Sequence, residues 1–212
     1  MTKRPLYYAT ENFHVPMICG RPASEIIAET ISAFECFAPE DSCIYLSSEI
    51  TTGQRFYSLL REHGVRSRDE LKQKLGTSFQ QAWKHLMDQN LAEGHAFFQE
   101  MHQGRHRNLI NPGPFFAKGW EQEHYLYLWE WVIVHKCCET RFNSGWNYSN
   151  GCTLEYAISL RKGIPRRHKD NRILDAAEAI ALIEAALADL GTAGIDTPTL
   201  RLNLQRIKEA AP

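Results

Sequence analysis

The sequence predicts an α/β fold, in which the strands of a central sheet alternate with helices that cover it. The first observation is a short apolar segment, residues 44–47, which leads through a polar turn into an amphipathic helix over residues 54–63. The second is a capped helix over residues 152–162, which Gly163 and Pro165 terminate. A chain of 212 residues, 43% of them hydrophobic, can bury a substantial core, so we expect a single domain over residues 1–212.

The first elements follow from local patterns taken in chain order. Residues 1–20 mix aromatic and polar side chains, and Leu6-Tyr7-Tyr8 is suited to a short edge strand. Pro22 stands at the start of a helix over residues 22–37, whose apolar residues recur at helical spacing. The strand 44–47 and the helix 54–63 then form the first strand-loop-helix unit, which Gly64 ends.

Residues 66–107 form a helical insertion between this unit and the next strand. Its apolar side chains recur at near-helical spacing: Leu71, Leu75, Phe79, Trp83, Leu86 and Met87. Asn90 and Gly94 indicate breaks, so we expect two or three short helices. The large aromatic side chains predict a homodimer contact, with packing onto the chain's own core as the alternative.

The second half continues the alternation. An apolar aromatic helix is expected within residues 118–136, followed by an unusually polar strand over residues 139–143. A basic loop follows Pro165. A helical C-terminal extension, about residues 171–212, contains an alanine-rich helix and a second helix that Thr197-Pro198 begins.

Composition excludes several classes of function. The formal net charge of -1 gives no reason to expect a polymeric nucleic acid or an acidic membrane as a partner. No apolar run approaches the ~20 residues that cross a bilayer, and no signal peptide pattern starts the chain. The six cysteines are irregularly spaced, which favours reduced thiols in a cytoplasmic protein.

No metal site is expected. Two sets of side chains come into question, His95 with His102 and His106, and His135 with Cys137 and Cys138. Neither set has the Cys-x-x-Cys or His-Glu-x-x-His spacing that fixes a coordination sphere. The sequence also implies no cofactor.

The segment from Gly145 to Pro165 has the layout of a binding or catalytic site. Ser149 and Asn150 are good N-cap residues, which places Glu155 in the first turn of the following helix. Backbone N–H groups at a helix start attract anions, so a phosphate could lie over Ser149, Asn150 and Gly151. The alternative is an ordinary capped helix, because acidic residues are common in first turns.

Three motifs in this chain, taken together, resemble the nucleoside 2-deoxyribosyltransferase-like family. Ile44-Tyr45-Leu46-Ser47-Ser48-Glu49-Ile50-Thr51-Thr52-Gly53 resembles that family's first strand and loop, although Ser48-Glu49 stands where the family has Gly-Pro. Asn108-Leu109-Ile110-Asn111-Pro112 resembles its second strand, which ends in Asn-Pro. Gly-Trp-x-x-Ser-x-Gly-x-x-x-Glu, ending at Glu155, is similar to its third element. The resemblance covers well under half of the chain.

The resemblance implies a Rossmann-like parallel sheet flanked by helices and a nucleoside or nucleotide site at its edge. Glu155 would be the nucleophile that attacks the anomeric carbon. The group that protonates the departing base is left open among Tyr45, Glu49 and Asn143. Further residues would bind the substrate: Ser47, Ser48, Gly53, Gly145, Trp146, Ser149 and Gly151.

The function expected from this resemblance is hydrolysis of the N-glycosidic bond of a nucleoside 5'-monophosphate or nucleoside. Base exchange by a deoxyribosyltransferase is the first alternative, because the same carboxylate chemistry serves both reactions. A non-catalytic nucleotide-binding module is the second. The departures at Ser48-Glu49 and in the polar strand fit either a re-specialised enzyme or a pocket without turnover. A third is an interaction protein that uses the aromatic insertion.

Overall fold

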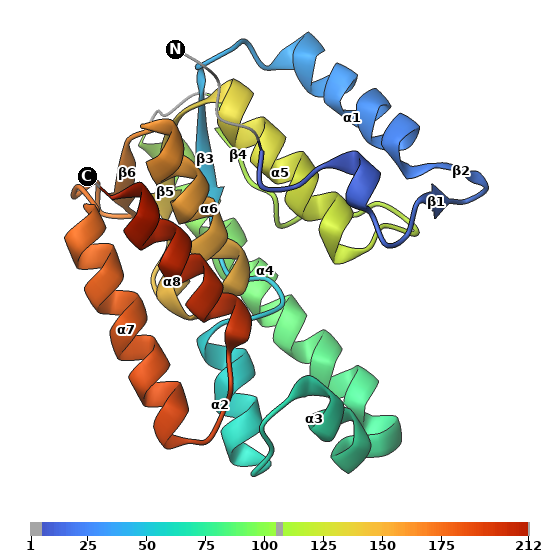
Figure 1. The fold of residues 1–212 in the computed structure, drawn as a ribbon, viewed down its shortest axis with the longest axis vertical. Helices are drawn as coiled ribbons and strands as arrows, with labels where there is room; N and C mark the ends of the chain where they lie inside the picture. Colours follow the sequence, from blue (N-terminus) through green and yellow to red (C-terminus); the bar gives the residue numbers. More distant parts are fainter. Residues whose placement is uncertain (1–5, 105–107, 212) are drawn as a thin grey trace.

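A four-stranded parallel sheet forms the centre of the protein, in a computed structural model that describes residues 6–104 and 108–211 (Figure 1). Its strands are β3 (Cys43–Ser47), β4 (Leu109–Ile110), β5 (Cys137–Phe142) and β6 (Arg166–His168), in the order β4-β3-β5-β6. The chain runs from β3 to β4 and then returns across β3 to β5. This reversal makes the carboxyl ends of β3 and β5 a topological switch point, where open α/β sheets bind ligands.

Helices cover both faces of the sheet, as the predicted Rossmann-like α/β fold requires. Side chains alternate along β3, so Tyr45 packs in a cluster with Leu128 of α5 (Gln122–Lys136) and Leu154 of α6 (Asn150–Lys162). Leu46 lies on the other face, against Phe97 of α4 (Phe79–Gln103). The α/β fold class predicted from the sequence is confirmed.

The N-terminal segment does not add a strand to the sheet. The backbone N–H groups of Tyr7 and Tyr8 donate instead to the carboxylate of Glu130 on α5, at 2.7 and 3.1 Å. The predicted edge strand at Leu6-Tyr7-Tyr8 is therefore wrong, because a side chain satisfies these donors. The 3-10 helix η1 (Thr10–Asn12) and a small hairpin of β1 (Met17–Ile18) and β2 (Arg21–Pro22) then lead into α1 (Ala23–Phe37), which packs beside α5. Residues 1–5 of the lead-in lie outside the described residues.

The insertion contains α3 (Arg68–Leu75), the 3-10 helix η2 (Gly76–Ser78) and the long helix α4, after α2 (Gln54–Glu62). α4 runs without a break through Asn90 and Gly94, so the predicted breaks are wrong. Asn90 donates to the carbonyl of Ile50 at 2.9 Å and accepts from Arg55 at 3.1 Å. A Cβ on Gly94 would lie 3.5 Å from Cβ of Ser48. Both residues therefore serve the contact of α4 with the loop after β3.

The aromatic stripe of the insertion packs within its own chain. Trp83 stacks on Phe79 with ring centroids 5.8 Å apart, meets Phe56 edge-on, and lies 4.2 Å from the guanidinium of Arg68. The aromatic side chains of the insertion therefore pack onto other residues of the same chain, which was the alternative to a homodimer contact. A homodimer remains a prediction. Residues 105–107 at the end of the insertion lie outside the described residues, and His106 with them.

The C-terminal helices α7 (Ala176–Thr192) and α8 (Pro198–Ala210) extend the layer of α6, at the opposite side of the molecule from α1 (Figure 1). α8 packs on α6, and α7 packs on α8. The segment predicted as a basic loop forms β6, which pairs with β5 from Thr140↔Arg166 to Phe142↔His168. Glu139 on β5 adds a side-chain contact between the two strands, because its carboxylate accepts from Arg141 at 2.5 Å and from Arg167 at 3.1 Å.

Candidate functional site

Two loops at the carboxyl ends of β3 and β5 approach each other closely at the switch point. They meet around Glu49, whose side chain passes next to Gly53 and Gly145. A Cβ on Gly53 would lie 2.1 Å from the carboxyl carbon of Glu49, and one on Gly145 would lie 2.8 Å from its Oε1. Both glycines have positive φ, 145° and 79°. The predicted substrate-binding glycines therefore make room for Glu49.

Glu155 faces β3 from α6. Ser149 caps this helix by accepting a hydrogen bond from the backbone N–H of Cys152 at 3.3 Å. The helix consequently begins at Asn150, and Glu155 lies in its second turn, which corrects the predicted position in the first turn. The helix starts two residues earlier than predicted, and Glu155 lies level with Tyr45 and Ser47 of β3.

The carboxylate of Glu155 is held by two hydroxyl groups. Tyr45 donates to its Oε1 at 2.7 Å, and Ser47 donates to its Oε2 at 2.5 Å. Tyr45 and Ser47 are two residues apart on β3, so their side chains point to the same face of the sheet. Both residues are buried. Glu155 itself remains partly exposed. The two hydroxyls therefore fix the orientation of the carboxylate.

Burial raises the pKa of Glu155, and the hydrogen bonds from Ser47 and Tyr45 oppose this rise. The pKa of Tyr45 is raised well above its usual value, first by burial and then by the negative charge of Glu155. Tyr45 therefore keeps its proton and acts as a hydrogen-bond donor. A glutamate in such surroundings can act as a nucleophile or as an acid-base group.

The helix start after Ser149 is largely occupied by the protein's own groups. The N–H of Asn150 donates to Oγ1 of Thr52 at 3.0 Å, and that of Cys152 to Ser149. Asn203 of α8 donates to the carbonyl of Asn150 at 2.9 Å. A Cβ on Gly151 would meet only Oγ of Ser149, at 3.9 Å, so that position is open. Burial and the charge of Glu155 raise the pKa of the Cys152 thiol, which favours a packed, protonated side chain.

The remaining predicted site residues turn toward α4 or toward the core. Asn143 donates to Glu93 of α4 at 3.5 Å, and with Ser48 it lines a small cavity of about 10 Å³. Trp146 is buried against Phe142 and Tyr156, with ring centroids 5.0 and 5.1 Å away. Trp146 therefore supports the loop as part of the core.

Arg141, near the carboxyl end of β5, pairs with other side chains than Glu155. Its guanidinium donates to Glu139 on the same strand and to the side chain of Asn171 at 3.2 Å. Its side chain therefore does not contact the Glu155 carboxylate.

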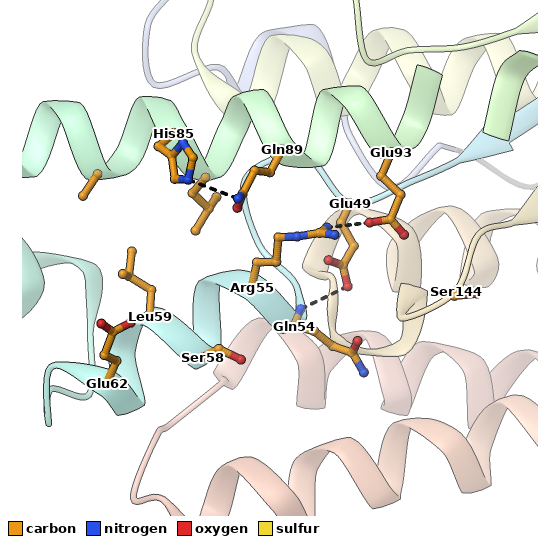
Figure 2. Close-up of a pocket in the computed structure, with 12 residues that line it drawn as sticks. Glu49, Gln54, Arg55, Ser58, Leu59, Glu62, His85, Gln89, Glu93 and Ser144 are labelled. Carbon is orange, nitrogen blue, oxygen red and sulfur yellow. Dashed lines mark hydrogen bonds and ion pairs between the residues drawn. The ribbon is translucent and has the colours of Figure 1, made fainter. Parts of the chain in front are cut away.

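A larger cavity, of about 560 Å³, opens between α2 and α4 (Figure 2). Glu49 stands in its wall beside Ser144, while Glu155 lies outside its lining. Burial raises the pKa of Glu49 to about 7, helped by the nearby charge of Glu93, whereas the N–H of Gln54 and the charge of Arg55 lower it. The cavity walls on α4, including Gln89 and Glu93, were not among the predicted site residues. The sequence feature that could have indicated them is the set of polar and small residues that interrupts the apolar stripe of α4.

Comparisons with known proteins found no match for the chain among protein-family models, curated proteins or solved structures. Among the described residues, no group of three or more His, Cys, Asp or Glu side chains is arranged to hold a metal ion. None of the helices in the described part of the chain is long and apolar enough to cross a membrane. The case for a function therefore rests on the geometry of the site.

Proposed function

We propose that the protein cleaves the N-glycosidic bond of a nucleoside, with Glu155 as the nucleophile. One observation carries the proposal: Glu155 stands at the switch point of a parallel sheet, its carboxylate is held by the hydroxyls of Tyr45 and Ser47, and the residue is not fully buried. Ligands of open α/β sheets bind at this place. An oriented carboxylate is also the group that glycosyl transfer by a retaining mechanism needs.

In the proposed reaction the carboxylate of Glu155 attacks the anomeric carbon and forms a glycosyl ester as the bond to the base breaks. The sugar passes through an oxocarbenium-like state, which the negative charge stabilises. Tyr45 and Ser47 hold the two oxygens in one orientation, so little reorganisation precedes the attack. Water then resolves the ester and frees Glu155. An acceptor base in place of water would give base exchange.

The engaged helix start favours a free nucleoside over a nucleoside 5'-monophosphate. The N–H groups of Asn150 and Cys152, which a phosphate would use, already donate to Thr52 and Ser149. A phosphate would have to displace these partners. The predicted cradle over Ser149 and Gly151 is therefore the less favoured form of the proposal.

The test is release of free base from a panel of nucleosides and matching 5'-monophosphates, separated by chromatography. We expect release from at least one nucleoside, and faster release than from its monophosphate. Addition of a second base distinguishes exchange from hydrolysis, because exchange yields a new nucleoside. Binding of nucleosides without any base release by the unmodified protein would instead identify a non-catalytic binding module.

A further inference from the structure

The cavity between α2 and α4 has the size and walls of a small-molecule site. Its volume, about 560 Å³, lies within the range of roughly 300–1,000 Å³ that is usual for ligand pockets. Leu59 of α2 and Ala82 and Leu86 of α4 give it an apolar part. Polar side chains from both helices surround that part, as Figure 2 shows. A partly apolar ligand that also carries polar groups fits this lining.

The polar walls contain three carboxyl groups and one cation, which is already paired. Glu49, Glu62 and Glu93 contribute three carboxyl groups. The guanidinium of Arg55 is already engaged, because it pairs with Glu93 at 2.6 Å and donates to Asn90 at 3.1 Å. Acceptors favour a ligand that donates hydrogen bonds. An exocyclic amino group on a heterocyclic base is such a donor.

Glu49 links this cavity to the carboxylate of Glu155. It lies two residues after Ser47, which donates to Glu155, and it lines the cavity. The charges of Glu155 and Glu49 both raise the pKa of the buried Cys152 thiol. Oε1 of Glu49 accepts from the N–H of Gln54 at 3.0 Å, and the side chain is nine-tenths buried.

We propose that the cavity between α2 and α4 binds the base of the substrate, that it selects bases with an exocyclic amino group, and that Glu49 gives the departing base its proton. This inference rests on the proposed function, because it assumes that Glu155 receives the sugar. It places the base between α2 and α4 and the sugar over Glu155.

The protons and electrons balance in two steps. As Glu155 forms its bond to the anomeric carbon, the electron pair of the glycosidic bond moves to the base, and the proton of the Glu49 carboxyl moves to a ring nitrogen. Glu49 is left as a carboxylate. In the second step it takes a proton from the water that attacks the ester, which returns Glu49 to its acid form and Glu155 to its carboxylate.

The surroundings of Glu49 suit this role at neutral pH. The charged and titratable groups that act on it or respond to it are Glu93 on α4, Arg55 and Tyr57 on α2, and Cys152 on α6. Burial is the largest influence and keeps the pKa of Glu49 at about 7. An acid with this pKa still holds a proton at neutral pH and can release it. Turnover of nucleosides should therefore decline as the pH rises above about 7.

The role of Glu49 is tested with substrates whose leaving group needs no proton. Base release from an amino-bearing nucleoside is compared with nitrophenolate release from the 4-nitrophenyl ribosides and 2-deoxyribosides, in unmodified protein and in Glu49→Gln. The amide keeps the acceptor for the Gln54 N–H but carries no acidic proton. We expect at least a hundredfold loss with the nucleoside and less than a fivefold loss with the nitrophenyl compounds. Glu100→Gln, on an exposed part of α4, is the matched control.

Equal losses with both leaving groups in a folded Glu49→Gln variant, or no loss with either, would overturn the role of Glu49. Folding is checked by thermal melting. The pH profile of the unmodified protein gives a second reading that needs no variant: a decline above about pH 7 with nucleosides but not with nitrophenyl compounds. Turnover that survives in Glu155→Gln would instead remove the proposed function itself, so the two failures are distinguishable.

The place of the base is tested by titrating free adenine and hypoxanthine into the protein in a calorimeter. Adenine carries the amino group and should bind at least tenfold more tightly than hypoxanthine. Ala82→Trp fills the cavity and should abolish adenine binding, whereas Ala96→Trp, on an exposed face of the same helix, should not. Adenine binding that survives in Ala82→Trp, or no preference between the bases, would contradict the assignment.

Discussion

Glu130 on α5 and Glu155 on α6 lie on neighbouring helices over the same face of the sheet, and burial raises the pKa of both carboxyl groups. Their partners differ. Glu130 is fully buried and accepts from the backbone N–H groups of Tyr7 and Tyr8 and from the guanidinium of Arg161 at 3.1 Å. Glu155 accepts from two hydroxyls and is not fully buried.

The difference separates a carboxylate that holds the fold from one that is available for chemistry. Glu130 joins the N-terminal segment to α5 and α6, with backbone donors and a cation that compensate its charge. Glu155 joins β3 to α6 through side-chain hydroxyls, and these orient it. The exposure of each residue and the type of its hydrogen-bond donors are therefore the basis on which we propose two different roles.

The largest expected effect is on turnover in Glu155→Gln. The amide fills the same space but is a poor nucleophile, so base release should fall on the order of a thousandfold or more. The melting temperature should not fall, because the variant removes a carboxyl group whose pKa burial raises. Turnover close to that of the unmodified protein would place Glu155 in the same structural class as Glu130.

Glu130→Gln should lower the stability of the protein and leave its activity unchanged. The amide nitrogen would face backbone N–H donors and leave Arg161 without its carboxylate, which we expect to cost about 3 kcal/mol of unfolding free energy. Chemical denaturation measures this loss. The KM for a nucleoside should stay unchanged in the folded variant, and a changed KM with unchanged stability would reverse the assignment.

Glu49→Gln should make stability less dependent on pH. The pKa of Glu49 is raised in the folded protein from 4.5 to about 7, so its contribution to stability is fully present below about pH 4.5 and is lost as the pH rises toward 7. The free energy of unfolding of the variant, minus that of the unmodified protein, should therefore be about 2 kcal/mol larger at pH 8 than at pH 5. Denaturation curves at both pH values test this gain. A constant difference would show that Glu49 titrates normally.

Tyr45→Phe should have the smallest effect, about a tenfold loss of kcat, since one hydrogen bond to the carboxylate disappears. That hydrogen bond lowers the pKa of Glu155, so its loss should move the acidic limb of the pH profile to higher pH. The measurement is kcat between pH 4 and pH 8. An acidic limb that stays in place would mean that the Tyr45 hydroxyl does not influence the pKa of Glu155.

Local patterns predicted the fold well where an element depends on its own residues. The strand over residues 44–47, the helix over residues 54–63 and the capped helix of Glu155 form within one or two residues of the predicted bounds. The predictions were wrong for elements that also contact residues far away in the sequence. α4 continues through Gly94, which lies next to Ser48, and β6 pairs with β5, where Arg167 also meets Glu139.

The site shows the same division. The sequence named Tyr45, Ser47 and Glu155, and the structure places their side chains within hydrogen-bond distance. The cavity between α2 and α4 could not be predicted, because it is lined by residues from Glu49 to Ser144 that come together only in the folded chain. Nor could the engagement of the Asn150 N–H by Thr52, since nothing local reveals that the loop after β3 reaches the start of α6.

The most direct test of the central claim is to look for the sugar on Glu155. The protein is mixed with a nucleoside whose 2'-fluorine slows hydrolysis of the ester, quenched in acid, digested and analysed by mass spectrometry. The account predicts a peptide that contains Glu155 and is heavier by one glycosyl group, with fragment ions that place the group on that residue. Base release without any such adduct, or an adduct on another residue, would contradict it.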